Sequence, residues 1–292
     1  MSNRHLLAQL PTAWAMGRVA LRGALSRRSS ALRKEDASVR ELSAERPPIP
    51  RDLLRDYIHH VGGSSDAWGG DLPYHLFPQW VFPLQLRLLE GLGVPLARAL
   101  NAGASMEVLS PLPAGEPMIV RAWLKRVDDR GDRAILELAS STGTPSAPNA
   151  LRAGMTLVLR RRSGGSGKRK LHEVPGDARE LGRLSVPAHA GRDFARLTGD
   201  LNPVHWLSPY ARLLGFPSVI NHGFSSMART LELLIRTTYE GDPRALRSFE
   251  CRFTKPLLLP AEVGVFTQGE RIYLWQAQGS PTYLEGCHGG AA

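Results

Sequence analysis

Hydrophobic residues in the first half of the chain follow one helical pattern and then several β patterns. Apolar positions between 83 and 92 recur with helical spacing, whereas the later apolar runs are short and bounded by turn residues. Proline and glycine separate the first two of these runs, and an Asp-Arg-Gly-Asp turn precedes the third. The pattern predicts one helix and four strands, at 83–92, 105–109, 118–124, 134–139 and 155–159.

The second half repeats this order. A helix is predicted at 227–235, followed by strands at 248–253 and 263–266 with another proline-bounded corner between them. Pro111 and Pro256, which begin the two corners, are 145 residues apart, a separation typical of one domain length. The repeated order predicts an α+β protein of two similar halves, each an antiparallel sheet wrapped around a central helix.

Changes in composition divide the chain further. The proline-rich run at 47–50 ends a basic N-terminal stretch, and the basic, Ser/Gly-rich run at 160–170 has the composition of a flexible linker. These breaks predict a basic N-terminal segment, an N-terminal half, a linker and a C-terminal half, at 1–48, 49–160, 161–180 and 181–292.

The N-terminal segment bears on localisation. Residues 1–34 contain seven Arg or Lys residues and no acidic residue, which fits either a mitochondrial transit peptide or a basic surface helix. A secretory signal is excluded, because Arg18 and Arg22 interrupt any apolar core. The two cysteines, Cys251 and Cys287, cannot build a disulfide framework, so a reducing compartment is expected. We therefore expect a cytoplasmic protein and leave mitochondrial targeting open.

Composition and charge limit the classes of partner that the chain is expected to bind. With 42% hydrophobic and 22% charged residues the chain can bury a core, and no run approaches the ~20 apolar residues of a membrane helix. The net charge of +10 favours an anionic partner such as nucleic acid, anionic lipid or a phosphorylated cofactor. Six of the basic residues lie in the run at 160–170 without an aromatic residue to stack on bases, so nucleic acid is not expected.

One segment carries candidate chemistry. Asp200 and His205 flank a turn formed by Asn202 and the following proline, so both can face one cleft and act as base and acid on a shared water. Gly223 opens the predicted second central helix, where free N–H groups favour a developing negative charge. A structural interpretation stays open at this point: Asp200 as a capping residue, Asn202 as a turn former and His205 as a surface histidine.

The same segment resembles the signature of the MaoC-like dehydratases, the R-specific enoyl-CoA hydratase (hydratase 2) family. The matching residues are Phe194-Ala195, Gly199-Asp200-Leu201-Asn202-Pro203-Val204-His205 and Ile220-Asn221-His222-Gly223. The resemblance implies a double hotdog fold, in which only the C-terminal half keeps the catalytic motif. The N-terminal half, similar to such proteins at 77–84, would then shape the acyl-chain tunnel.

The resemblance also implies roles for these residues. Asp200 and His205 would activate the water that adds to C3 of a trans-2-enoyl thioester, giving an (R)-3-hydroxyacyl thioester. The Gly223 amide would bind the thioester oxygen, and Asn202 would brace the loop at the substrate. His222 is expected to be structural. No metal or redox cofactor is implied, because side chains activate the water.

Partners and alternatives follow from the same reading. The substrate carrier would be coenzyme A or acyl carrier protein, both of which suit a basic rim, and a homodimer is possible. A hotdog acyl-CoA thioesterase, which attacks the thioester carbonyl, is the first alternative. A non-catalytic module that binds acyl thioesters is the second, although a mere binder has no need of both Asp200 and His205.

Overall fold

The computed structural model describes residues 5, 9, 41–90, 99–130, 133–160, 174–277 and 280–290 of the chain. Most of the basic N-terminal segment and of the linker, at 10–40 and 161–173, lies outside the described residues. Within the described part, no helix combines the length and hydrophobicity required to cross a membrane.

The first half contains five strands and one long central helix, preceded by shorter helices. Its elements are β1 (Glu41–Arg46), α2 (Arg51–His60), α3 (Ser65–Trp68), η3 (Tyr74–Leu76), α4 (Pro78–Glu90), β2 (Ala99–Val108), β3 (Met118–Asp129), β4 (Arg133–Gly143) and β5 (Leu151–Arg160). The four predicted strands correspond to β2–β5. Residues 83–90 of the predicted helix form the C-terminal part of α4, and its last two residues lie outside the described part of the chain.

The second half has the same plan. Its elements are β6 (Arg179–Val186), α5 (Ala190–Thr198), η5 (Pro203–His205), α6 (Ser208–Leu213), α7 (Gly223–Thr238), η6 (Pro243–Ala245), β7 (Leu246–Phe253), β8 (Ala261–Gln268), β9 (Arg271–Trp275) and β10 (Leu284–Gly290). The predicted helix and strands lie within α7, β7 and β8. The strands β1, β6, β9 and β10 were not predicted.

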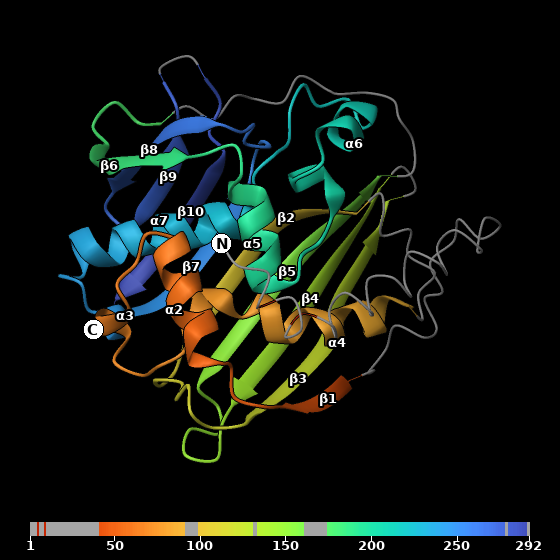
Figure 1. The fold of residues 1–292 in the computed structure, drawn as a ribbon, viewed down its shortest axis with the longest axis vertical. Helices are drawn as coiled ribbons and strands as arrows, with labels where there is room; N and C mark the ends of the chain where they lie inside the picture. Colours follow the sequence, from red (N-terminus) through yellow and green to blue (C-terminus); the bar gives the residue numbers. More distant parts are fainter. Residues whose placement is uncertain are drawn as a thin grey trace.

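All ten strands form one antiparallel sheet whose order reads the same from both edges. The order is β1-β3-β4-β5-β2-β7-β10-β9-β8-β6, so each strand of one half has a counterpart in the other (Figure 1). The halves meet where β2 pairs with β7, and Ser105 lies opposite Glu250 in that pairing. The mirrored strand order, not any single pair, confirms that the two halves are built alike.

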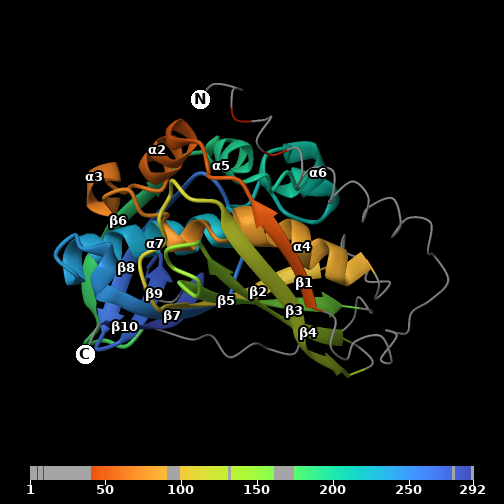
Figure 2. The same ribbon diagram turned by 90° about the horizontal axis from the view of Figure 1, so that it is seen from below.

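The central helices α4 and α7 lie against one face of the sheet, and α2, α5 and α6 cover them from the other side (Figure 2). Phe77 before α4 and Phe224 in the first turn of α7 meet edge to face, with ring centroids 5.7 Å apart. Residues 224–235 of α7 are buried all around, as expected for a helix enclosed between two layers. The arrangement is the predicted α+β double hotdog.

β1 lies in the predicted basic N-terminal segment, but it pairs with β3 and forms an edge of the sheet. The strand Glu41–Arg46 alternates exposed and half-buried residues, and its sequence, ELSAER, contains few apolar residues. Strands of this kind give a weak hydrophobic signal, because none of their side chains is fully buried. The sheet of the first half therefore begins before residue 49.

A buried polar cluster joins the halves. The carboxylate of Glu232, on α7, accepts hydrogen bonds from Trp68 Nε1 and His75 Nε2, both at 3.0 Å, and the Tyr57 hydroxyl bonds to His75 Nδ1 at 2.9 Å. Gly63 lies so close to the Glu232 carboxylate that a Cβ there would collide with it. We call Tyr57, Trp68, His75 and Glu232 the Glu232 cluster. A buried carboxylate is stable only with such partners, so the cluster ties the first half to the central helix of the second.

Candidate active site

The loop between Asp200 and His205 is shaped by two local signals. α5 ends at Gly199, which adopts the left-handed conformation (φ 81°) that a glycine permits, and its N–H bonds to the Ala195 carbonyl at 2.9 Å. The Asn202 side chain then accepts the Val204 N–H at 3.3 Å and caps η5, whose first residue is a proline. The chain therefore turns back at Asn202, with Asp200 before the turn and His205 after it.

The imidazole of His205 has a defined tautomer. Its Nδ1 bonds to the main-chain oxygen of Ile220 at 2.9 Å, and because a carbonyl only accepts, Nδ1 carries the proton and Nε2 keeps its lone pair. Burial lowers the pKa of His205, while the Asp200 charge and the Ile220 carbonyl act in the opposite direction. The His205 main-chain oxygen packs on α5 at Gly191, where any Cβ would collide with it. The ring is thus a fixed, neutral base.

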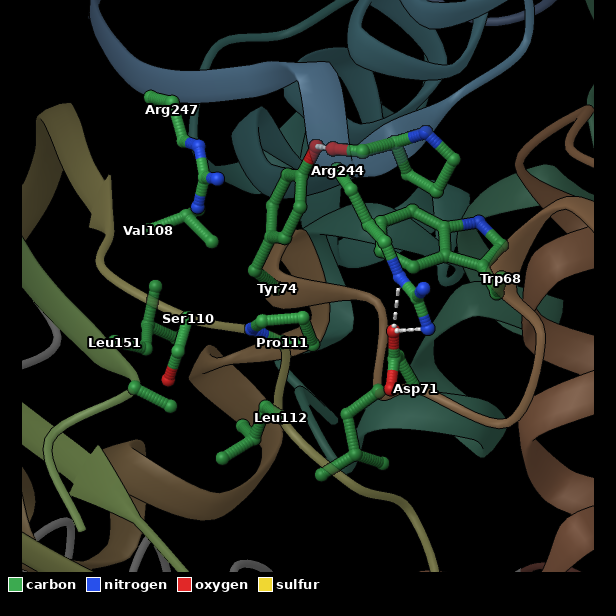
Figure 3. A pocket seen from close by; sticks show the side chains of 13 residues that line it. Trp68, Asp71, Tyr74, Val108, Ser110, Pro111, Leu112, Leu151, Arg244 and Arg247 are labelled. Atoms are coloured by element: carbon green, nitrogen blue, oxygen red, sulfur yellow. Dashed lines mark hydrogen bonds and ion pairs between the residues drawn. The ribbon is translucent and has the colours of Figure 1, made fainter. Parts of the chain in front are cut away.

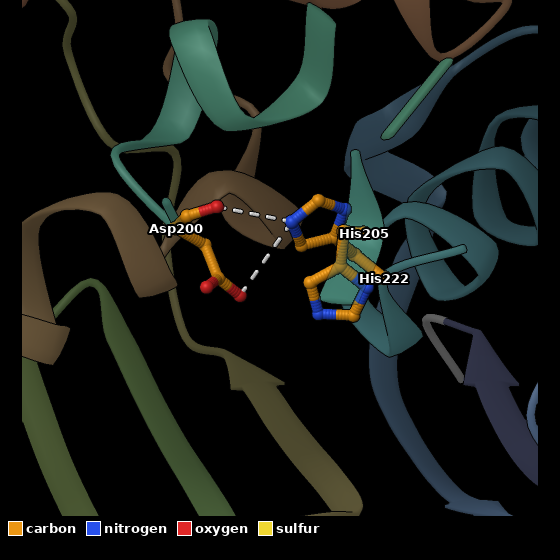
Figure 4. A group of neighbouring side chains, drawn as sticks. All are labelled: Asp200, His205 and His222. Atoms are coloured by element: carbon orange, nitrogen blue, oxygen red, sulfur yellow. Dashed lines mark hydrogen bonds and ion pairs between the residues drawn. The ribbon is translucent and has the colours of Figure 1, made fainter. Parts of the chain in front are cut away.

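Asp200, His205 and His222 form one group. A carboxylate oxygen of Asp200 and one nitrogen of each ring lie within 4.8 Å of one another, and Figure 4 shows the carboxylate facing two stacked rings. The Asp200 side chain is 28% exposed, so solvent or a substrate can reach it. The structure therefore brings together the two residues that the sequence assigned to water activation.

His222 belongs to this group, although the sequence interpretation treated it as structural. Its ring stacks on that of His205 with centroids 3.6 Å apart and an interplanar angle of 26°, and Phe194 covers it at 4.9 Å. Its Nε2 donates to the Asp200 main-chain oxygen at 3.1 Å. Burial, and then the neighbouring His205, lower the pKa of His222 well below the ordinary value, so this ring is also neutral. Its position directly before Gly223 was the one sequence signal available.

Gly223 is the first residue of α7, where main-chain N–H groups have no partner within the helix. Among the described residues, no acceptor bonds to the Gly223 amide. Its backbone does not lie in the left-handed region, so conformation does not require a glycine. The reason is space: a Cβ at this position would stand 3.0 Å from the ring of Phe253.

Comparison with known proteins identifies this part of the chain. The family model of the MaoC-like domain matches residues 174–280, which include the loop, both histidines and Gly223. The second half is a MaoC-like domain.

Proteins with similar sequences extend the similarity into the first half. Peroxisomal enoyl-CoA hydratase 2 of Arabidopsis thaliana is 27% identical over 193 residues, which cover 57% of this chain and 60% of that protein. The match thus spans less than two thirds of that relative. The 3-hydroxyacyl-thioester dehydratase X (HtdX) of Mycobacterium tuberculosis is 27% identical over 236 residues, covering 78% of this chain and 79% of the relative.

Solved structures show the same architecture around the MaoC-like domain. The crystal structure of HtdX superposes with a TM-score of 0.69 at 22% identity, covering 86% of this chain and all of that one. A second M. tuberculosis protein, described as having a double hotdog fold, superposes with a TM-score of 0.55 at 12% identity, covering 85% of this chain and 94% of that one. At these identities the likeness concerns the fold.

Asp200, His205 and His222 are also residue types that can coordinate a metal ion. The stacked rings of His205 and His222 argue against it, since a tetrahedral ion needs ligand lone pairs that converge on one point. One nitrogen of each ring is already bonded to a carbonyl. The arrangement fits a held water better than a metal, and cofactor-free chemistry stays a prediction.

Proposed function

We propose that the protein adds water reversibly to trans-2-enoyl thioesters and gives (R)-3-hydroxyacyl thioesters. The observation that carries the proposal is the neutral His205 imidazole, its Nε2 lone pair free, grouped with the Asp200 carboxylate. Gly223 with its free amide begins α7 in the same region, one residue after His222. A base, a second acceptor and an N–H donor are the groups that hydration next to a carbonyl requires.

In the hydration direction, Asp200 and His205 hold one water between them. As the water oxygen forms its bond to C3 of the enoyl thioester, His205 Nε2 takes a proton from it. The electron pair of the C2–C3 double bond moves onto the thioester, whose oxygen becomes enolate-like. The imidazolium then returns the proton to C2, so one water has been added and both side chains are regenerated.

The enolate oxygen needs a donor that is in place before the reaction. The Gly223 N–H at the positive end of the α7 dipole provides one, and the half-exposed position of the glycine leaves it accessible. Asn202 acts on the other side of the site by holding the turn that sets the Asp200–His205 spacing. Its exposed side chain also leaves room for the predicted contact with substrate.

The names of the relatives support a thioester substrate. One is an enoyl-CoA hydratase and the other a 3-hydroxyacyl-thioester dehydratase, which are the two directions of the same reaction. The net charge of +10 suits either an anionic coenzyme A or an acidic carrier protein as the acyl carrier. One relative is named peroxisomal and the other is bacterial, so the names favour no single compartment.

The test follows two products of crotonyl-CoA at once. Hydration removes the enoyl absorbance without releasing free thiol, whereas a thioesterase releases thiol, and a binding module does neither. Thiol release at the rate of absorbance loss, or no loss at all with folded protein, would overturn the proposal. The control is Asp200→Asn, which should bind crotonyl-CoA but turn it over slowly.

A further inference from the structure

The segment around α6 exposes a concentration of apolar side chains. Among the described residues, eight large hydrophobic side chains are exposed, and four of them lie within nine consecutive positions. These four are Trp206 (40% exposed), Leu207 (41%), Leu213 (80%) and Leu214 (48%), which we call the α6 patch. Single exposed leucines are ordinary on a protein surface, but a group of large apolar side chains in one short segment indicates a surface that contacts a partner.

The main chain holds the α6 patch outward. The Leu207 oxygen accepts the Ala211 N–H at 3.0 Å as α6 begins, and the Leu214 N–H bonds back to the Ala211 oxygen at 3.1 Å as the helix ends. The buried residue of α6 is Ala211, so the helix packs inward through a methyl group. The Trp206 indole donates to the Leu201 main-chain oxygen at 3.2 Å. The apolar side chains at both ends of α6 therefore remain exposed.

The charge beside the α6 patch is positive. No acidic residue occurs at 201–231, whereas Arg212 of α6 is exposed. Arg192 is exposed on α5, which lies in the same outer layer of helices as α6 (Figure 2). An apolar surface with this charge favours an anionic partner over a neutral one.

The basic N-terminal stretch begins on the same layer. His5 Nε2 lies 2.8 Å from an Asp56 carboxylate oxygen on α2, and the Gln9 side chain donates to the Leu197 main-chain oxygen on α5 at 2.8 Å. Residues 1–34 carry seven Lys or Arg residues and no acidic residue. The layer that exposes the α6 patch is thus also the layer to which the most one-sidedly basic part of the sequence is attached.

These features fit a lipid surface better than a folded protein. A protein partner must present a hollow for each protruding side chain, whereas the boundary between head groups and acyl chains accepts leucines of any arrangement. Tryptophan is favoured at this boundary, since its ring is apolar and its N–H is polar. Arginine and lysine are attracted by anionic head groups at the membrane surface.

We propose that the α6 patch docks the protein on an anionic lipid bilayer. Leu207, Leu213 and Leu214 enter the boundary between head groups and acyl chains, with Trp206 at the level of the head groups. Arg212 and the basic N-terminal residues face the lipid phosphates. The proposal does not depend on the hydratase activity, because docking is measured without substrate.

Vesicles of phosphatidylcholine and phosphatidylglycerol in equal parts test the docking by co-sedimentation with the full chain. The chain should bind these vesicles at least about 10-fold more tightly than vesicles of phosphatidylcholine alone, because several basic residues act together. The double substitution Leu213→Ser with Leu214→Ser should weaken binding to the mixed vesicles at least about 10-fold, because two apolar side chains no longer leave water.

The fluorescence of Trp206 gives an independent measurement of docking. Trp68 is a buried reference: its indole donates to Glu232 at 3.0 Å, and the cavity beside it has about 20 Å³ of space, enough for one water (Figure 3). Mixed vesicles should therefore shift the emission of Trp206, obtained by subtracting the spectrum of Trp206→Phe, to shorter wavelength.

Ile119→Ser is the matched control, because Ile119 is 49% exposed but lies on β3 in the sheet. It should bind mixed vesicles like the parent protein, and circular dichroism establishes that each variant is folded. The proposal is overturned if the parent chain does not sediment with mixed vesicles, binds neutral vesicles equally well or shows no shift of Trp206. It is also overturned if the double leucine variant binds like the parent or no more weakly than Ile119→Ser. Light scattering that shows an oligomer of the parent and a monomer of the double variant would assign the α6 patch to a second copy of the chain instead.

Discussion

The imidazole of His222 stacks on that of His205 and donates its Nε2 proton to the main-chain oxygen of Asp200. The His222 ring therefore contacts both residues that are proposed to activate the water. It is uncharged, because burial lowers its pKa. A positive ring here would repel the imidazolium that forms on His205 during turnover. The proposed reaction therefore requires a neutral His222 as well as its position beside His205.

His222→Phe tests this dual contact, because phenylalanine keeps the stacking and loses the bond to Asp200. Since that bond fixes one side of the loop, we expect kcat for crotonyl-CoA to fall roughly 10-fold, the scale of one lost hydrogen bond. His288→Phe is the matched control: it removes a buried histidine of β10 that bonds to the Tyr239 hydroxyl. Equal kcat values in the two variants would show that His222 does not position the loop.

The proposed dyad predicts a larger loss. Asp200→Asn and His205→Gln should each lower hydration at least ~100-fold, the usual contribution of an acid–base group, while the fold is retained. Steady-state rates with crotonyl-CoA measure this, and Glu107→Ala, an exposed carboxylate of β2, serves as control. Near-parental activity in either folded variant would place the chemistry elsewhere.

The pH profile has a definite sign. His205 acts as a base only when neutral, so activity is lost as pH falls through its pKa, and burial places that pKa below the ordinary 6.5. The Asp200 charge raises the pKa within the site. In Asp200→Asn the acid limb of residual kcat/KM should therefore move to lower pH. A shift to higher pH would contradict the assigned interaction.

Gly223→Ala separates space from hydrogen bonding. The added Cβ meets the Phe253 ring at 3.0 Å but leaves the main-chain N–H in place. We expect turnover to fall about 10-fold, because a shift of a few tenths of an ångström misplaces the oxyanion donor. Phe253→Leu in the same chain should restore part of it. If the double variant loses more activity than the two single substitutions together, crowding against Phe253 is not the cause.

The Glu232 cluster makes a prediction about stability. Glu232→Ala leaves Trp68 Nε1 and His75 Nε2 without their shared acceptor in a buried site. Removing one partner from such a site typically destabilises a protein by about 3 kcal/mol. Urea unfolding measures the difference, with the exposed Glu250→Ala of β7 as control. If the free energy of unfolding falls no more than in the control, water replaces Glu232 as the acceptor for Trp68 and His75.

Local signals in the sequence account for much of the site. Pro203, Asn202 and Gly199 each act on their immediate neighbours, so the turn between Asp200 and His205 could be predicted from the motif alone. The contact of His222 with Asp200 could not, because it depends on how α7 begins relative to the end of α5. The Glu232–Trp68 bond joins residues 164 positions apart, and no local pattern encodes it.

The same distinction holds for the fold. The strands β2–β5 and the two central helices have strong hydrophobic patterns, since one face of each strand packs against the helices and most of the circumference of each helix is covered. The edge strands β1 and β6 have polar, alternating sequences and became recognisable as strands only through pairing with β3 and β8. Edge position accounts for β1 and β6, but β9 and β10, which lie inside the sheet, were not predicted either.

The central pairing of β2 with β7 also has a consequence for folding. Strands β2–β5 pair with one another within the first half, but Ser105 and Glu250 can meet only after 145 further residues have been synthesised. Pairings of such separation are entropically slow. During synthesis the first half therefore presents the open edge of β2 for a long interval, an edge able to pair with another chain. Pairing with β7 covers that edge once the second half has been made.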